Sequence, residues 1–297
     1  MNDILTVKEK IEKVLKQYSS KKLNCIGINL YDSGDWYSKA YFSLPIEISS
    51  MKAFNHNEAF EIFQEFKKND FIDYFERVYT EDKNELKLNF LLKKQDKIST
   101  EKILNIIRSY INIKNDELKE ILNLAKMKVS DSKNRKYEAL YYINLTFDLK
   151  KVKNSIKRLS CYYMIRFEPV GPVVVTPEKY YKEYIVSSNK FFLKLVKDYY
   201  IISEIEAGAF YIAALDFYSD GKRTYKLYFK IKDNVLLFKK LKELFKFNNF
   251  FLKKICEIEN YLIFNKEKLN LIFLAFCINN KNEQSLNFYF VKKKNRS

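Results

Sequence analysis

The feature that most constrains the fold is an alternation of polar and apolar residues that recurs in paired segments. In residues 221–231, GKRTYKLYFKI, the side chains of Tyr225, Leu227 and Phe229 fall on one face of an extended strand. Lys226 and Tyr228 fall on the opposite face. A strand with one apolar and one polar face belongs to a sheet that packs on one side, so its polar face meets either solvent or an interior space.

The same unit, a helix followed by two strands and a turn, recurs five times along the chain. The predicted helices are 3–18, 57–69, two short helices that begin near 99 and 115, 176–185, 233–247 and 249–262. The predicted strand pairs are 24–31 with 36–45, 73–80 with 85–92, 137–149 with 160–167, 209–218 with 223–231, and 268–278 with 284–293. No Pro, Gly or Ser-rich linker divides these units, so we expect one domain over residues 1–297.

The second strand of every pair has one polar and one apolar face. The polar faces carry Tyr37, Lys39, Tyr41 and Ser43; Glu85, Lys87 and Asn89; Ser160, Tyr162, Met164 and Arg166; Thr224, Lys226 and Tyr228; and Ser285, Asn287 and Tyr289. An open sheet with its polar face in water is the simpler interpretation of any single pair. Because each pair follows amphipathic helices that need an apolar partner, five concordant pairs favour a closed barrel with the polar faces inside.

The predicted fold class is therefore α+β: a ten-stranded antiparallel β-barrel built from five helix-hairpin repeats, with the helices packed outside. A repeat of roughly 50–60 residues is long for a solenoid, which makes closure the better interpretation of the repetition. A barrel of this size is too wide for its own side chains to fill, so it encloses a cavity lined by cations and tyrosines.

The net charge of +17, from 54 Lys and Arg against 37 Asp and Glu, points to polyanionic partners. These are nucleic acid, an anionic membrane or a phosphorylated small molecule. The abundant residue types have A/T-rich codons and the basic residues are spread along the chain, so compositional drift is favoured over a nucleic-acid function.

Several common kinds of site are missing from the sequence. The five glycines form neither a GxGxxG motif nor a phosphate loop, and no DDxxD-type aspartate cluster occurs. The single histidine, His56, precedes a predicted helix and is interpreted as a surface or capping residue. The four cysteines are far apart and suggest reduced thiols, so no metal site is predicted: Cys25, Cys161, Cys256 and Cys277.

The N-terminal segment is amphipathic and lacks the apolar core of a signal peptide. No run reaches the roughly 18 apolar residues of a membrane span. We therefore expect a cytoplasmic protein with no membrane partner.

Two stretches carry a resemblance to a known family. The sequence ALDFYSDGKRTYKLYF at 214–229 is similar to an aspartate-bearing strand, hairpin turn and Lys-x-Tyr strand of the ABBA, or PT-barrel, aromatic prenyltransferases. WYSKAYFSLP at 36–45 resembles the first hairpin of that family, which ends in a proline. Within the family, 86–92 and 269–290 look most like the cyanobactin-type peptide prenyltransferases.

The resemblance implies transfer of an allylic prenyl group, dimethylallyl or geranyl, from its diphosphate to an aromatic or peptide side chain. The partners implied are a prenyl diphosphate donor and an aromatic or cyclic-peptide acceptor, as in the modification of ribosomal cyclic peptides. A small-molecule aromatic acceptor is the alternative.

The predicted lumen supplies groups that such a reaction needs. A diphosphate leaving group calls for cations, and the candidates come from four hairpins: Lys39, Lys87, Arg166 and Lys226. An allyl cation calls for a π-rich wall, and the candidates are Tyr41, Tyr162, Tyr228 and Tyr289. Each lysine has an alternative interpretation as a rim residue that reaches solvent, and each tyrosine as ordinary strand packing.

The sequence departs from the family pattern at two places. Magnesium-dependent members carry an aspartate in the first hairpin where this chain has Lys39, so magnesium is compatible with the resemblance but not required by it. Indole- and peptide-prenylating members keep a glutamate on the first strand to take the acceptor proton. This chain offers Asn24 or Asn29 there, which are the candidates for the acceptor side.

Two rival interpretations remain open. A basic, tyrosine-rich sheet could stack single-stranded nucleic acid on an exposed face, although no Gly-Phe signature of that kind occurs and this partner is disfavoured. A barrel without the family's carboxylate could also bind a hydrophobic ligand and catalyse nothing.

Overall fold

The structure is a computed structural model of the 297-residue chain. The residues it describes are 6–17, 23–44, 54, 56–80, 84–93, 97–111, 113–125, 129–130, 136–137, 140–164, 190–204, 208–265 and 269–293.

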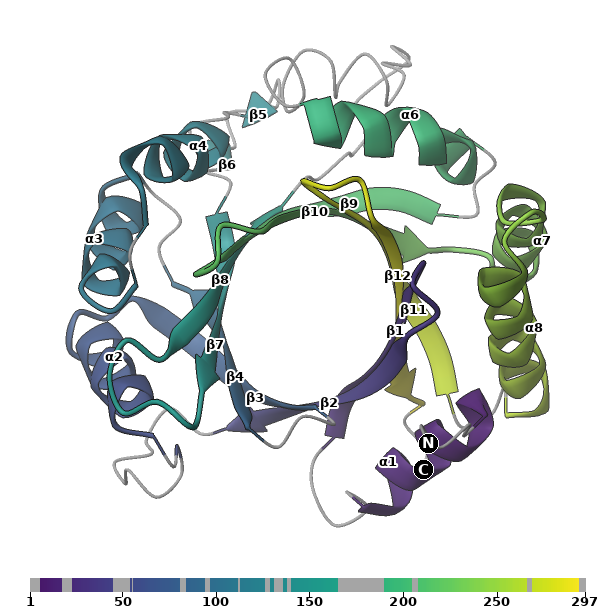
Figure 1. The fold of residues 1–297 in the computed structure, drawn as a ribbon, viewed down its shortest axis with the longest axis horizontal. Coiled ribbons are helices and arrows are strands. Elements are labelled where there is room, and N and C mark those ends of the chain that lie inside the picture. The colour runs from purple at the N-terminus through teal and green to yellow at the C-terminus, as the bar shows by residue number, and fades with distance from the viewer. Residues whose placement is uncertain are drawn as a thin grey trace.

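Ten strands form a closed antiparallel barrel, in the order β1-β12-β11-β10-β9-β8-β7-β4-β3-β2 (Figure 1). The strands are β1 (Leu23–Tyr31), β2 (Trp36–Leu44), β3 (Ile72–Thr80), β4 (Glu85–Leu92), β7 (Leu140–Asp148), β8 (Ile156–Met164), β9 (Gly208–Tyr218), β10 (Arg223–Ile231), β11 (Leu269–Asn279) and β12 (Gln284–Lys292). Consecutive strands pair as hairpins, and β1 closes the barrel on β12 with Ile26 opposite Phe290. Two short strands, β5 (Val129–Ser130) and β6 (Lys136–Tyr137), pair with each other outside the barrel.

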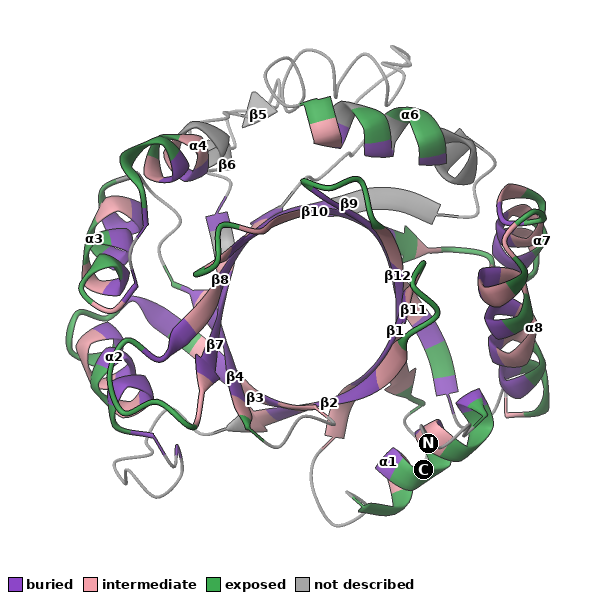
Figure 2. Ribbon diagram, viewed as in Figure 1, coloured by how far each residue is buried: buried purple, intermediate pink, exposed green. Residues whose placement is uncertain are grey.

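The helices lie outside the barrel wall, as Figure 1 shows. They are α1 (Val7–Gln17), α2 (Asn57–Lys68), α3 (Lys97–Arg108), α4 (Asn115–Ala125), α6 (Lys190–Glu204), α7 (Asn234–Leu244) and α8 (Asn249–Phe264). Figure 2 shows buried residues on the helix faces that meet the barrel and exposed residues on the faces that turn away. None of the helices among the described residues is long and apolar enough to cross a membrane.

The core fills the space between the helices and the outer face of the barrel. In α2 the apolar residues Ile62, Phe63 and Phe66 recur at helical spacing and are fully buried. They meet the apolar faces of β3 and β4, where the Phe63 ring lies 4.8 Å from that of Phe75. Because apolar burial drives folding, this outer layer is the main source of stability, and it leaves the inner face of the strands free for polar residues.

Local signals set several element ends. The Asp233 and Asn248 side chains accept hydrogen bonds from backbone N–H groups in the first turns of α7 and α8. The single histidine caps α2, because His56 Nδ1 accepts from the Ala59 N–H. His56 is 8% exposed, so the capping interpretation is confirmed and the surface one is wrong. Gly34 and Gly221 have φ of 90° and 83° in the turns of their hairpins, a conformation that favours glycine.

The predicted fold class is confirmed, and the predicted strand pairs match closely. Strand β8 begins at Ile156, four residues before the predicted 160, because the charged start of IKRLSCYYM reads as a loop in the sequence. Helix α6 was not predicted. The predicted helix at 176–185 and the predicted diphosphate ligand Arg166 lie outside the described residues.

The polar strand faces point into the barrel. The register pairs lumen-facing residues across neighbouring strands, such as Lys226 with Ala214 and Asn29 with Asn287. The face that carries lysines and tyrosines is therefore enclosed by the described strands. An exposed sheet for stacked bases, the premise of the nucleic-acid interpretation, is wrong for these strands.

Candidate active site

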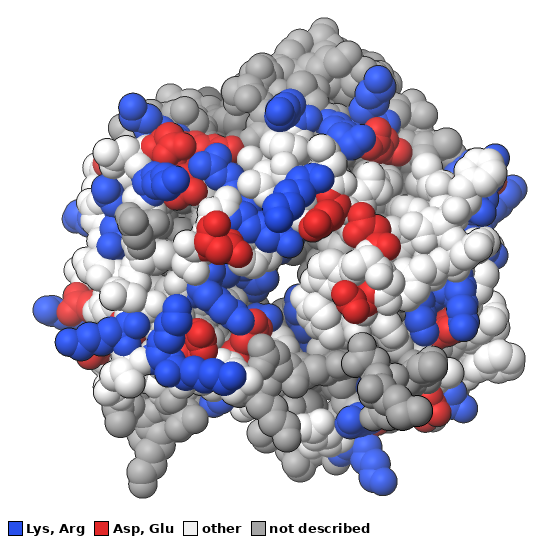
Figure 3. Space-filling view, viewed as in Figure 1, with Lys and Arg blue, Asp and Glu red and all other residues white. Residues whose placement is uncertain are grey.

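One end of the lumen, where the hairpin turns lie, forms a cavity of about 660 Å³. Its lining includes three of the lumenal cations, Lys39, Arg158 and Lys226. Figure 3, which views the barrel along its axis, shows Lys and Arg side chains around the central opening. A concave, enclosed pocket with convergent charges is the usual form of a small-molecule site.

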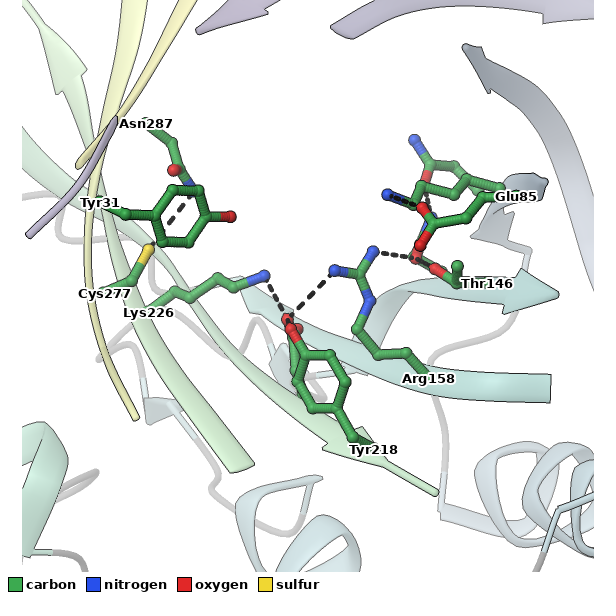
Figure 4. Close-up of polar contacts among 12 residues, drawn as sticks. Tyr31, Glu85, Thr146, Arg158, Tyr218, Lys226, Cys277 and Asn287 are labelled. Atoms are coloured by element: carbon green, nitrogen blue, oxygen red, sulfur yellow. Dashed lines mark hydrogen bonds and ion pairs between the residues drawn. The ribbon is translucent and has the colours of Figure 1, made fainter. Parts of the chain in front are cut away.

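Lys226 and Arg158 share one buried carboxylate at this end. Lys226 Nζ lies 2.5 Å and Arg158 Nη1 3.7 Å from Asp216 Oδ2, and Figure 4 shows the two cationic side chains converging there. Burial alone would raise the pKa of Asp216, but the two cations outweigh it and the pKa is lowered. Burial would likewise lower the pKa of Lys226, but the charge of Asp216 raises it. The three groups are therefore a charged triad that burial does not neutralise.

Lys87 is held by a second carboxylate, Glu85, on its own strand. Lys87 Nζ lies 2.6 Å from Glu85 Oε2, and Lys157 pairs with the other carboxylate oxygen. Burial, followed by repulsion from Arg158, lowers the pKa of Lys87 to about 8. The positive charge of Lys87 is consequently sensitive to pH just above neutrality.

Lys39 is buried in the lumen, and among the described residues no ion pair involves it. Burial lowers the pKa of Lys39 well below its ordinary value, and the charges of Lys87, Arg158 and Lys226 lower it further. The main contact of its ammonium group is the Tyr37 ring, 5.0 Å away. An anion in the cavity would remove this repulsion and stabilise the charged form.

Inside this end of the lumen the cations Lys39, Lys87, Arg158 and Lys226 outnumber the carboxylates Asp216 and Glu85. Three further carboxylates that line the cavity, Asp32, Asp35 and Glu283, are exposed. A further unused donor is Arg158 Nε, which is buried and has no hydrogen-bond partner among the described residues. Buried polar groups are normally satisfied, so this N–H is a donor that an anion in the cavity could use. Within the described ranges no group of three or more His, Cys, Asp or Glu side chains is arranged to hold a metal ion. The cationic residues at this end of the lumen fit an anion.

Next to the cations, tyrosine rings line the lumen as a continuous belt. The centroids of neighbouring rings are 5.7–6.1 Å apart in the order Tyr41, Tyr289, Tyr228, Tyr162 and Tyr142. Burial raises the pKa of all five phenols, so the belt presents neutral, electron-rich rings. The four predicted tyrosines thus lie together, and Tyr142 is an addition. Such a belt can stabilise a cation without carrying a charge that would capture it.

A second polar cluster lies at the end of the belt, around Glu76 of β3. We call it the Glu76 cluster, and its members are Asn24, Ser43, Tyr74, Glu76, Asn89 and Tyr142. The predicted acceptor-side residue Asn24 donates to Glu76 Oε1 at 2.8 Å. The other, Asn29, instead lines the cation cavity, so the two candidates do not share a site.

Sequence reasoning missed Arg158, Asp216 and Glu76. Arg158 lies on the same face of its strand as Ser160 and Tyr162. A predicted strand that began at 156 instead of 160 would have included it. Asp216 and Glu76 lie on the first strands of their hairpins, whereas only second strands alternate cleanly. In β3 the outward-facing Arg77, whose guanidinium lies 4.8 Å from the Tyr79 ring centroid, obscures the alternation.

No family model matches the sequence, and no curated protein matches it either. Solved structures do match. AnaPT from Neosartorya fischeri aligns with 10% identity and a TM-score of 0.56, over 91% of this chain and 80% of its own. NotF in complex with brevianamide F and DMSPP gives 10% identity and a TM-score of 0.55, over 91% and 80%.

A bacterial structure matches to a similar degree. It is 6-dimethylallyltryptophan synthase from Micromonospora olivasterospora in complex with DMASPP and Trp, with 9% identity, a TM-score of 0.52, and coverage of 90% and 81%. Identities this low show the fold alone. The chain has the PT-barrel fold of the aromatic prenyltransferases over nearly all its length.

Proposed function

We propose that this protein transfers an allylic prenyl group from its diphosphate to an aromatic acceptor. The observation that carries the proposal is the adjacency, in one enclosed lumen, of excess buried cations and a belt of neutral tyrosine rings. The structures that share the fold bear the names of prenyltransferases and dimethylallyltryptophan synthases, which supports the same chemistry.

The cation end would bind and activate the diphosphate. Lys39, Lys226 and Arg158 line the cavity, and Lys87 lies buried beside them. Charge-assisted hydrogen bonds from these groups would stabilise the negative charge that develops as the allylic C–O bond breaks. Because the cations come from four different strands of a rigid wall, they are positioned before the substrate arrives.

The tyrosine belt would hold the prenyl chain and the allyl cation. Tyr228 and Lys226 are two residues apart on β10 and face the same side, which supports a pose with the diphosphate at Lys226 and the prenyl carbons near Tyr228. The electron-rich faces of the rings stabilise positive charge and exclude water, which would otherwise capture the cation.

The acceptor in this proposal is an aromatic side chain. We propose more specifically that this side chain belongs to a cyclic peptide made by the ribosome. The support for a peptide is the similarity of residues 86–92 and 269–290 to cyanobactin-type prenyltransferases. These residues belong to β4 and to the β11–β12 hairpin, which build opposite parts of the lumen wall.

The test is a direct assay with dimethylallyl and geranyl diphosphate and a panel of tryptophan, tyrosine and cyclic-peptide acceptors. We expect a mass increase of one prenyl group on an acceptor, with or without added magnesium, because side chains supply the positive charge. The matched binding test is thermal unfolding with a non-hydrolysable prenyl thiodiphosphate, which should raise the melting temperature.

The two readouts separate the outcomes. A thermal shift without any prenyl adduct would favour a barrel that binds the ligand and catalyses nothing. Absence of both a shift and an adduct would refute the proposal. Polynucleotide binding that weakens steeply with salt, together with no response to the thiodiphosphate, would favour the nucleic-acid alternative.

A further inference from the structure

The turn between β7 and β8 carries three exposed lysines, and we call residues 150–153 the lysine turn. Lys150, Lys151 and Lys153 surround Val152, whose side chain is 75% exposed. Among the described residues no ion pair involves these lysines, and none of them lines the lumenal cavity. The lysine turn is therefore a patch of positive charge outside the lumen, with an apolar side chain at its centre.

Two buried residues at the start of α2 hold the backbone next to and within the lysine turn. The Glu58 carboxylate accepts hydrogen bonds from the backbone N–H groups of Asn154 and Ser155. His56 Nδ1 caps α2, so Nε2 carries the proton and donates to the Lys151 carbonyl oxygen at 3.0 Å. Exposed turns are generally mobile, and these contacts order this one in advance, which lowers the entropy cost of binding a partner there.

The lysine turn adjoins the mouth of the lumen at its cation end. Lys157, just beyond the turn, pairs with Glu85, whose other carboxylate oxygen binds the lumenal Lys87. The Lys157 carbonyl oxygen accepts from the Ser219 N–H in the β9–β10 turn, and Lys222 of that turn lines the cavity. A molecule that extends out of the lumen on this side therefore meets the lysine turn.

The opposite side of the mouth is acidic. Asp32 and Asp35 in the β1–β2 turn and Glu283 in the β11–β12 turn line the cavity and are exposed. The order of strands around the barrel places these two turns across from the β7–β8 turn. Figure 3 shows Asp and Glu side chains to the right of the central opening and a gathering of Lys and Arg to its left.

A mouth with one basic and one acidic side selects among anionic partners. A nucleic-acid strand is negative along its whole length, so a strand that crossed the mouth would be repelled by the acidic side. The diphosphate of the donor meets the buried cations inside the lumen, which the lysine turn does not join. A peptide can carry acidic residues in one segment and neutral or basic residues in the next, so it fits both sides.

On the basis of the proposed function, we infer that the lysine turn binds an acidic segment of the acceptor peptide while the aromatic residue of the peptide enters the lumen. The lysines pair with Asp or Glu side chains of the peptide, and Val152 contacts an apolar side chain between them. These contacts are the same before and during prenyl transfer. They therefore lower KM for an acidic acceptor and leave kcat unchanged.

The test uses two series of peptides that share one tryptophan acceptor. In one series three glutamates lie two to six residues from the tryptophan, and in the other three glutamines replace them. With dimethylallyl diphosphate as donor, KM should be about tenfold lower for the best glutamate peptide, the combined effect of three exposed ion pairs. The difference should shrink as salt is raised to about 0.5 M, because exposed charges are screened.

The decisive variant removes the positive charge of the turn and keeps its backbone contacts: Lys150→Gln/Lys151→Gln/Lys153→Gln. Its KM for the glutamate peptide should rise about tenfold, to the value for the glutamine peptide. Its kcat, its KM for the glutamine peptide and its thermal shift with the prenyl thiodiphosphate should not change. Replacement of the same lysines by glutamate should reverse the preference and favour a peptide with three lysines.

The matched control lowers the net charge of the chain by the same amount at exposed positions of α1: Lys8→Gln/Lys13→Gln/Lys16→Gln. It should retain the tenfold preference of the unaltered protein for the glutamate peptide. A loss of preference in this control equal to that in the lysine-turn variant would assign the effect to net charge and overturn the inference.

Fluorescence anisotropy of the labelled peptides without donor separates docking from chemistry. The glutamate peptide should bind more tightly than the glutamine peptide, and the lysine-turn variant should lose the difference. Equal binding of the two peptides, or an unchanged preference in the variant, would overturn the inference and leave the proposed function intact. A weaker thiodiphosphate shift in the variant would assign the turn to the donor, and competition by polyuridylate would assign it to nucleic acid; either result overturns the inference.

Failure of the proposed function has a different signature. If the unaltered protein neither responds to the thiodiphosphate nor forms any adduct, the prenyl transfer itself is refuted. The anisotropy measurement then decides by itself whether the lysine turn binds acidic peptides.

Discussion

The two halves of the lumen use the same kind of group, a lumenal carboxylate, in opposite ways. At the turn end, Asp216 lies between Lys226 and Arg158, and Glu85 lies between Lys87 and Lys157. At the other end, Glu76 is held by two amides and two phenols. The first arrangement fixes positive charges in place, and the second keeps a negative charge available.

The difference teaches that a carboxylate in a lumen cannot be assigned a role from its burial alone. Removing one partner of a buried ion pair leaves an uncompensated charge, whereas removing one of four neutral donors leaves a carboxylate that is still satisfied. Substitutions at the turn end should therefore change stability and donor binding together. Substitutions in the Glu76 cluster should change transfer with little effect on either.

The largest expected effect is that of Lys226→Met, which leaves Asp216 with Arg158 at 3.7 Å as its remaining cation. We expect a loss of about 3–5 kcal/mol in the free energy of unfolding, as for other broken buried pairs. Binding of the thiodiphosphate should disappear as well. Urea unfolding and thermal shift measure the two effects.

The double variant Lys226→Met/Asp216→Asn is the control for this prediction. It removes both charges of this pair but leaves Arg158 without its carboxylate, so only part of the lost stability should return, while the thiodiphosphate shift stays absent. Equal stability of the single and double variants would contradict the view that Asp216 is the counterion of Lys226.

The second effect is a pH dependence of about tenfold at the turn end. Because the pKa of Lys87 is lowered to about 8 in the folded protein, affinity for the thiodiphosphate should fall as pH rises from 7 to 9. Stability should change in the opposite sense. Between pH 8 and the ordinary lysine pKa of about 10.4, the unfolded chain holds more protons at this group, so its contribution raises the unfolding free energy with pH.

Lys87→Met is the variant that isolates this group. Its affinity for the thiodiphosphate should be weaker at pH 7 and should vary less between pH 7 and 9. Isothermal titration across that range measures both features, and an unchanged pH dependence in the variant would assign the titration to another group.

The third effect is a few-fold loss of transfer in Tyr142→Phe. The change removes one of the four donors to Glu76 and keeps the ring of the belt, so about 1 kcal/mol of stability should be lost at most. The affinity of the protein for the prenyl thiodiphosphate should not change. Tyr110→Phe, which removes a hydroxyl that donates to Glu61 outside the barrel, is the matched control for loss of a phenol.

The smallest effect is expected for Gly27→Ala. A Cβ at position 27 would lie 3.3 Å from Tyr41 Cε2, so the ring must move by a few tenths of an ångström, at a cost of about 1 kcal/mol. The rate of prenyl transfer should fall slightly, without a change in affinity for the prenyl thiodiphosphate. Gly34→Ala is the comparison, because it meets no atom within 4 Å and should act through its positive φ alone.

The barrel could be predicted because the second strand of each hairpin alternates over most of its length, with apolar exceptions at Leu91, Met164 and Val291. Lys39, Tyr41, Lys226 and Tyr228 were placed on the inner face by parity, and the amphipathic helices indicated which face was outer. The pairing order of the strands followed from five hairpins in sequence, since neighbouring antiparallel strands need only short turns.

The partners of these residues could not be predicted in the same way. The pairing of Lys226 with Asp216 depends on the side-chain geometry across β9 and β10, and strand parity does not contain that information. Glu76 was hidden because β3 has polar residues on both faces, Glu76 inside and Arg77 outside. The resemblance directs attention to β1, where Asn24 stands, whereas the carboxylate that Asn24 contacts lies two strands away in the barrel.

The pairing of β1 with β12 has a consequence for how the protein is made. These are the first and last strands of the barrel in the sequence, so a nascent chain must hold β1 unpaired on that edge until β12 has left the ribosome. Tyr41 and Tyr289 meet across this seam. The enclosed lumen is thus the final part to form, and a chain that ends before β12 would expose two unpaired sheet edges and tend to aggregate.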